Sequence, residues 1–222
     1  MIDAALLSRI LRSPADVARA CRADRDVAAI ARNALVTIVV SAALFGATVG
    51  SWRGGRQILF SAMKMPVGLV GTLALSIPAF YALAAVFGRP WPLRAVLSLA
   101  LVGGARFSLS LLAMTPLLWL TIDFGAPYHA VKLVAVIAYA LAGVSGLEVL
   151  VRGLGDGEGK RVTITLFVAI FTLLGAQNAW ILRPYLGRPS DPEPPLFTRE
   201  REGGVIVQVV KSLREIGSKA AP

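Results

Sequence analysis

The stretch NALVTIVVSAALFGATVGS (Asn33–Ser51) contains no charged side chain. A helix rises about 1.5 Å per residue, so roughly 20 apolar residues cross a hydrocarbon layer about 30 Å thick. Four further stretches of similar length and polarity follow in the chain. The five predicted spans lie near residues 33–51, 67–87, 95–120, 129–151 and 162–182.

The composition also indicates a membrane domain. The chain has 222 residues, of which 56% are hydrophobic and only 16% are charged, and its mean hydropathy is +0.68. Backbone groups in lipid need internal hydrogen bonds, and the apolar stretches lack the alternation of barrel strands. We therefore predict an all-α fold, a polytopic integral membrane helical bundle over residues 33–185, in a bacterial inner (plasma) membrane.

Both ends of the chain are predicted to form amphipathic helices outside the bundle. In the basic segment 1–32, Ser13 is expected to cap a helix that starts at Pro14. Its arginines form either a stripe for lipid headgroups or a solvated face. We favour an interfacial helix, because four apolar residues of the segment fit the membrane surface: Leu6, Leu7, Ile10 and Leu11. Residues 186–222 are first proline-rich and then apolar at helical spacing.

A short apolar piece, QILFSAMKMP (57–66), separates the first two predicted spans. It is bounded by Arg56 and Lys64 and is too short to cross the membrane. We expect it to form an interfacial or re-entrant half-helix, with the second span starting at Val67. Pro78 is expected to kink that span, because proline removes one backbone hydrogen bond.

The orientation of the spans is weakly encoded. With five spans, the two membrane sides carry nearly equal numbers of Lys and Arg residues. A hairpin turning at 103–106 would give six crossings and place both tails in the cytoplasm, which suits the positive-inside rule better. Residues 95–125 are too few for two crossings, so we predict five spans with a cytoplasmic N-terminus. An impermeant thiol reagent on Cys21 is expected to report the N-terminal side.

The sequence offers little catalytic chemistry. The net charge of +10 is spread over tails and loops without a nucleic-acid-binding motif, so we expect the partners to be membrane lipids and not nucleic acid. Cys21 is the only cysteine and His129 the only histidine, and residues 155–160 lack the Walker spacing. No paired carboxylates share a helix face. We predict a non-enzymatic protein without cofactor or metal.

Four polar residues at membrane depth are the best candidates for an intramembrane site: Arg106, Glu148, Gln177 and Asn178. An ionisable side chain in the membrane is costly, so it usually has a partner or a water-filled cavity. We expect Arg106 to pair with Glu148 across a depth gap of roughly 13 Å, judged from the helix rise. Structural pairing between neighbouring helices is favoured over solute binding.

Two further patterns concern contacts of the helices. Ala42, Gly46 and Gly50 form a small-residue stripe for close helix packing, either within the chain or in a homodimer. At the end of the last span, four residues form an interfacial anchor or, alternatively, a docking motif for a partner: Trp180, Arg183, Pro184 and Tyr185.

Two stretches resemble an uncharacterised family of small polytopic bacterial membrane proteins. They are residues 45–88, with Lys64-x-Pro66 before the second span, and residues 175–202, where the motif from Gln177 to Pro189 closes the last span. The layout of a polar N-terminal segment and five spans is also distantly similar to Yip-domain proteins. The resemblance implies a polytopic helical fold and no catalytic residues. In this chain Gly203-Gly204 follow Arg201-Glu202, where the family has an asparagine.

Two functions fit these features. The first is a non-enzymatic membrane scaffold or accessory subunit that binds a partner protein, a second copy or a lipid surface. The alternative is a small transporter or channel-like subunit with a polar intramembrane site around Arg106 and Glu148. A lipid-modifying enzyme ranks third.

Overall fold

The computed structural model describes residues 4–23, 26–87, 91–154, 159–182 and 185–186, and they form an all-α protein. Five of its helices are long and apolar enough to cross a membrane, so the chain is a multi-pass membrane protein, as predicted. The predicted C-terminal amphipathic helix lies outside the described residues. The helices are α1 (Ala4–Arg12), α2 (Pro14–Arg22), α3 (Val27–Ser51), α4 (Arg56–Val86), α5 (Leu93–Asp123), α6 (Tyr128–Gly153) and α7 (Lys160–Leu182).

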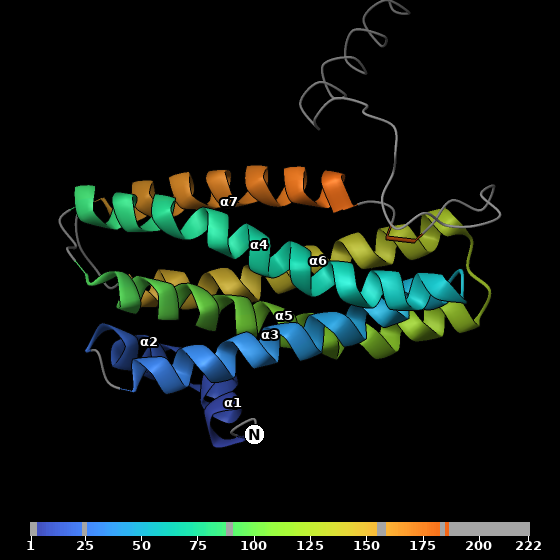
Figure 1. Cartoon of the computed structure of the whole chain (residues 1–222), viewed down its shortest axis with the longest axis horizontal. Helices are drawn as coiled ribbons and strands as arrows, with labels where there is room; N and C mark the ends of the chain where they lie inside the picture. Colours follow the sequence, from blue (N-terminus) through green and yellow to red (C-terminus); the bar gives the residue numbers. More distant parts are fainter. Residues whose placement is uncertain (1–3, 24–25, 88–90, 155–158, 183–184, 187–222) are drawn as a thin grey trace, which may run out of the picture.

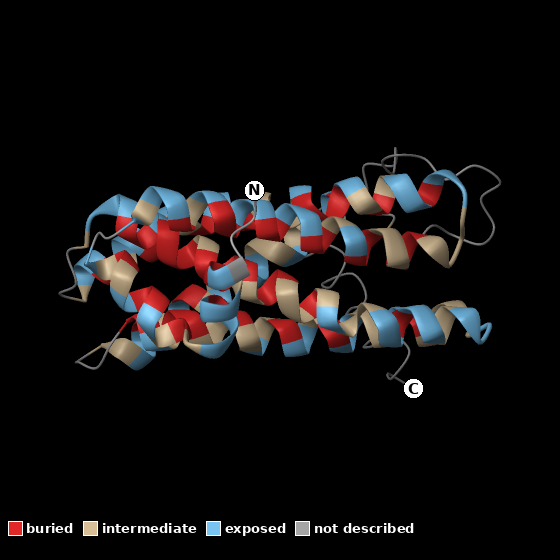
Figure 2. Cartoon of the chain, turned by 90° about the horizontal axis from the view of Figure 1, so that it is seen from below, coloured by how far each residue is buried: buried red, intermediate tan, exposed pale blue. Residues whose placement is uncertain are grey.

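The five long helices lie side by side along one direction (Figure 1). The most extensive contacts join α3 to both α4 and α5, α5 to α6, and α4 to α7. Going from one neighbouring helix to the next, the bundle therefore has the order α7, α4, α3, α5, α6. Buried residues face the neighbouring helices, whereas exposed residues follow the outer faces (Figure 2). Many exposed residues are large and apolar, as expected for faces in contact with lipid.

The second span is longer than the sequence predicted. Residues 57–66 form no separate half-helix, because α4 runs without a break from Arg56 to Val86 and contains both Pro66 and Pro78. The prediction took Lys64 as a mark of the membrane boundary, but only 3% of this residue is exposed. Lys64 therefore faces the bundle, and the helix continues past it. Proline is tolerated inside a membrane helix because neighbouring groups satisfy the freed carbonyl.

The third span is a single helix, which excludes the hairpin at residues 103–106. Gly103 and Gly104 lie in the middle of α5, where they allow close packing and make no turn. A Cβ atom on Gly104 would lie 2.6 Å from Leu73 Cδ1, and one on Gly103 would lie 3.3 Å from the carbonyl oxygen of Gly146. The two glycines are thus explained by helix contacts.

The N-terminal segment packs on the bundle. Helices α1 and α2 contact α5, and α2 also contacts α6. Leu6 and Ile10, which were expected to lie on the membrane surface, are buried in the core of the chain, although Leu11 is 47% exposed. Ser13 precedes α2 as predicted, but its side chain makes no capping hydrogen bond.

Cys21 is fully buried among the residues that α2 contributes to the core. Burial raises the pKa of its thiol from 9.0 to about 11. The expectation that an impermeant reagent labels Cys21 in the folded protein is therefore wrong, because the thiol is both covered and protonated at neutral pH.

Candidate functional site

A row of polar side chains joins α5 and α6, and we call it the charged ladder: Arg106, Ser110, Ser145, Glu148 and Arg152. Arg106 Nη2 lies 2.5 Å from Glu148 Oε2, and Arg106 Nε donates to Ser145 Oγ at 3.2 Å. Ser110 Oγ lies 2.8 Å from Ser145 Oγ. Glu148 also pairs through its other oxygen with Arg152, one helical turn further along α6. The structure thus brings the predicted pair Arg106 and Glu148 together.

The stagger of α5 against α6 explains why this pair meets without the expected depth gap. Gly103 lies against Gly146, and Gly153, at the end of α6, lies against Leu99. Helix α5 starts at Leu93 and so extends beyond the end of α6 by more than a turn. The predicted gap of roughly 13 Å assumed helices that end at the same level. The glycine contacts set a different register, which places Arg106 beside Ser145 and Glu148.

The charged ladder is electrostatically unbalanced. Its one carboxylate, on Glu148, faces two guanidinium groups, so the ladder keeps one positive charge. Exposure rises along it, since the side chains of Arg106, Glu148 and Arg152 are 14%, 34% and 49% exposed. Arg106 Nη1 is buried and has no hydrogen-bond partner among the described residues. The ladder therefore runs from a half-buried inner end at Ser110 to a more exposed outer end at Arg152.

A second group of buried polar residues lies on α4, and we call it the α4 polar face. Its members follow helical spacing and are at most 4% exposed. This face was not predicted from the sequence, because Lys64 was assigned to a membrane boundary and the other members are small or neutral. The signal was their spacing within one apolar span. They are Gln57, Ser61, Lys64, Thr72 and Ser76.

The end of α7 and the residues after it dock on this face. Asn178 Nδ2 donates to Thr72 Oγ1 at 3.1 Å, and a Cβ on Gly68 would lie 3.0 Å from Leu182 Cδ1. Gln57 Nε2 donates to the carbonyl oxygen of Tyr185 at 2.6 Å. Ser61 Oγ donates to the same oxygen. The chain therefore turns back onto α4 where α7 ends.

This docking changes two predictions. Asn178 contacts the α4 polar face and does not lie in a cluster with Arg106 and Glu148. Gln177 is also on α7, which makes its extensive contacts with α4 and not with the ladder helices. Tyr185 was expected to anchor in the headgroups, yet it packs against the buried core. The remaining predicted anchor residues lie outside the described side chains, namely Trp180, Arg183 and Pro184.

The small-residue stripe of α3 also packs on α4. A Cβ on Gly50 would lie 2.5 Å from the carbonyl oxygen of Gln57, and one on Gly46 would lie 2.7 Å from Met65 Cγ. Ala42 is buried in the same core cluster. Of the two explanations offered by the sequence, packing within the chain is therefore the one observed. The stripe is covered and leaves no surface for a second copy.

The chain matches no protein-family model, no curated protein and no solved structure. The resemblance to the family of small polytopic membrane proteins thus stays a prediction. Both stretches behind that resemblance contribute to the contact between α4 and the end of the chain's last span, through Gln57 and Thr72 on α4 and through Asn178 and Tyr185. Within the described part of the chain, no group of three or more His, Cys, Asp or Glu side chains is placed to hold a metal ion.

Proposed function

We propose that this protein is a non-enzymatic scaffold or accessory subunit of a bacterial inner membrane, with a cytoplasmic N-terminus. Its partner in this proposal is a membrane-spanning helix of another protein, which packs on α7. The cytoplasmic orientation is supported by the arginines of the first two helices, four of which lie in their last turns. The proposal rests on the surface of α7.

Helix α7 is the span least covered by the rest of the chain. Among the described residues it packs extensively on α4 alone, and it lies at the edge of the bundle (Figure 1). Five small exposed residues recur along its other side at intervals of four and three, and we call them the α7 outer face. They are Thr165, Ala169, Thr172, Ala176 and Ala179. Small residues let two membrane helices approach closely, and such interfaces are enriched in them.

The bundle interior supports a scaffold more than a conduit. Three buried hydroxyl groups are satisfied by carbonyls of their own helices: Thr37 donates to Asn33, Ser76 to Thr72 and Ser108 to Gly104, at 2.6 to 2.8 Å. The charged ladder lies between α5 and α6, whereas the α4 polar face contacts α7, so these two polar groups belong to different pairs of helices. A solute site needs convergent polar groups instead.

The proposal is tested by photo-crosslinking in native membranes from a photoreactive residue at Thr172. We expect an adduct with another membrane protein, and we expect the added substitutions Ala169→Leu and Ala176→Leu to abolish it. The matched control places leucines at Ala82 and Ala85, which are equally exposed on α4. An adduct of twice the chain mass would identify a second copy as the partner. Adducts with lipid alone would refute the proposal.

The alternative, a small transporter, is favoured by one observation. Lys64 is buried in a membrane-spanning helix, and an ionisable residue in that position often lies on a transport path. This function requires a solute-dependent signal, in flux or in thermal stability, that Arg106→Ala or Lys64→Met removes. A response that both variants leave unchanged would reject it.

A further inference from the structure

The outer end of the charged ladder has the charge and donors of an anion site. Glu148 neutralises only one of its two arginine neighbours, and Arg152 is 49% exposed. The carboxyl end of α6 adds only about half a negative charge nearby. A positive charge thus persists where the ladder opens to the surroundings. Arg106 also keeps one buried guanidinium nitrogen without an acceptor among the described residues.

The position of this end is the level of the lipid headgroups. Arg152 is the penultimate residue of α6, and Glu148 lies one turn before it. Helix α6 is 26 residues long, close to the length needed to cross the hydrocarbon layer with a few residues to spare. Residues in its last turn therefore reach the depth at which phospholipid phosphates lie. Arginine is well suited to this anion, because its planar guanidinium donates two parallel hydrogen bonds to a phosphate.

We propose that Arg152 and Arg106, with Glu148 between them, form a binding site for a phosphate group, either of a phospholipid headgroup or of a free phosphate. Glu148 holds the two guanidinium groups in place and competes with the phosphate for them. The Nε atom of Arg106 donates a hydrogen bond to Ser145 Oγ at 3.2 Å, and this bond holds the arginine in position. The site is separate from the α7 outer face and does not depend on the proposed scaffold function.

The test compares three probes on the purified full-length protein: dihexanoyl phosphatidylglycerol, inorganic phosphate, and dihexanoyl glycerol, which lacks the phosphate. Binding is measured by native mass spectrometry and by the shift of the thermal unfolding midpoint. We expect the phosphate-bearing lipid to bind and the phosphate-free lipid not to bind. Inorganic phosphate binding as tightly as the lipid would make the free anion the ligand, whereas a response to the lipid alone would make it the headgroup.

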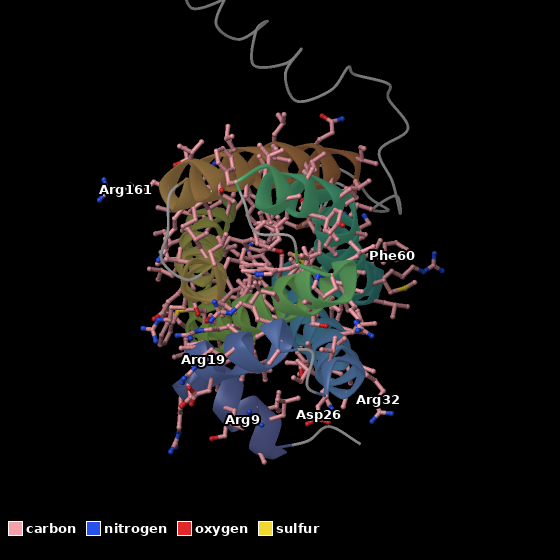
Figure 3. All side chains as sticks on the ribbon, turned by 90° about the vertical axis from the view of Figure 1, so that its left-hand side faces the viewer. Arg9, Arg19, Asp26, Arg32, Phe60 and Arg161 are labelled. Atoms are coloured by element: carbon pink, nitrogen blue, oxygen red, sulfur yellow. The ribbon has the colours of Figure 1, made fainter. Side chains whose placement is uncertain are left out.

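Two substitutions have opposite expected effects on this binding. Arg152→Gln removes an exposed donor and should weaken binding about tenfold, the worth of one charge-assisted hydrogen bond. Glu148→Gln frees both guanidinium groups and should strengthen binding. The control is Arg161→Gln, which removes the same charge from the start of α7 on the same membrane side, where Figure 3 shows Arg161 projecting outward. We expect it to bind like the unchanged protein.

The proposal would be overturned by any of three results. One is equal binding by the Arg152→Gln and Arg161→Gln variants, which would mean that the lipid responds to the net positive charge of the protein and not to Arg152 in particular. A second is weaker binding by Glu148→Gln in a variant that still melts cooperatively, which would mean that the ladder serves helix packing alone. Binding of dihexanoyl glycerol as tight as that of the phospholipid would also exclude a phosphate site.

Discussion

The charged ladder and the α4 polar face differ in the interactions that stabilise their polar side chains. Both keep polar side chains stable at membrane depth, where an unsatisfied group is costly. The ladder joins α5 and α6, which follow each other in the chain, and it pairs opposite charges near one end of the bundle. The α4 polar face is almost fully buried and binds α7, three helices later, mainly through hydroxyl, amide and carbonyl groups.

The difference follows from what each interaction tolerates. A pair of opposite charges is costly to remove from water and is stabilised where water or lipid headgroups can solvate it. The charged ladder accordingly lies toward the membrane surface, and the exposed fraction of its side chains rises from Arg106 to Arg152. A neutral hydrogen bond leaves little residual field and is stable in the dry interior. Asn178 on α7 and Thr72 on α4 are joined by such a neutral hydrogen bond. Four experiments test this comparison, beginning with the largest expected effect.

Gly46→Ala should be the most damaging change, because the added methyl group would overlap with the backbone of α4 and with Met65. Separating α3 from α4 disturbs the whole α4 polar face, and we expect a loss of about 3 kcal/mol of stability. The measurement is the thermal unfolding midpoint in mild detergent. Gly143→Ala is the control, since a Cβ there meets no atom within 4 Å. Equal midpoints for the two variants would show that α3 and α4 are not closely packed.

Glu148→Gln should come next, because it leaves two guanidinium groups facing each other without a carboxylate. Breaking a buried pair costs about 3–5 kcal/mol, and with Glu148 34% exposed we expect about 2 kcal/mol in lipid-free detergent. Arg152→Gln should cost less than about 1 kcal/mol, because that side chain is 49% exposed. A larger loss for Arg152→Gln would contradict the order of burial along the ladder.

Thr72→Val should have a smaller effect on the α4 polar face. It keeps the shape of the side chain but removes the acceptor of Asn178, and hydrogen bonds between membrane helices contribute about 0.6 kcal/mol on average, at most about 1.7. Thr165→Val is the matched control on the exposed side of α7. The two variants are compared in unfolding by a denaturing detergent. Identical curves would mean that Asn178 does not join α7 to α4.

The smallest effect at neutral pH concerns Cys21, whose burial depends on α2 packing against the ladder helices. Its pKa of about 11 leaves about one hundredth of the thiol ionised at pH 9, so thiol reagents should react slowly until the protein unfolds. The unfolded thiol loses its proton at lower pH than the folded one. At neutral pH the thiol is protonated in both states and stability is unaffected, whereas stability should decline as pH rises from about 9 to about 11, by up to about 2 kcal/mol.

A cysteine at Ala23, in a Cys21→Ser background, is the control for this experiment. Ala23 is exposed at the end of α2, so its replacement should react quickly in the folded protein and report the N-terminal side of the membrane. Rapid labelling of Cys21 in the folded protein would show that α2 does not pack on the bundle.

The sequence alone determined the number and approximate position of the spans, because apolar length is a local property that hydrocarbon thickness makes decisive. It also predicted the pair of Arg106 and Glu148, since an unpaired charge at that depth is costly, although not the register that lets them meet. It failed at residues 57–66, where one lysine was taken for a membrane boundary. Whether a charged side chain faces a headgroup or the interior depends on the residues that surround it in space, and the local sequence does not show which residues these are.

Only the tertiary structure decided the register of α5 against α6, the return of Tyr185 to α4 and the burial of Cys21. Each depends on contacts between residues far apart in the chain, and those contacts are set by shape. Glycines at 46, 50, 103 and 146 allow the backbones of neighbouring helices to approach closely. The positions of these close contacts set how far one helix is shifted along its neighbour. Shifting one apolar helix along another hardly changes the hydropathy of the contact, so close packing of the side chains determines the register.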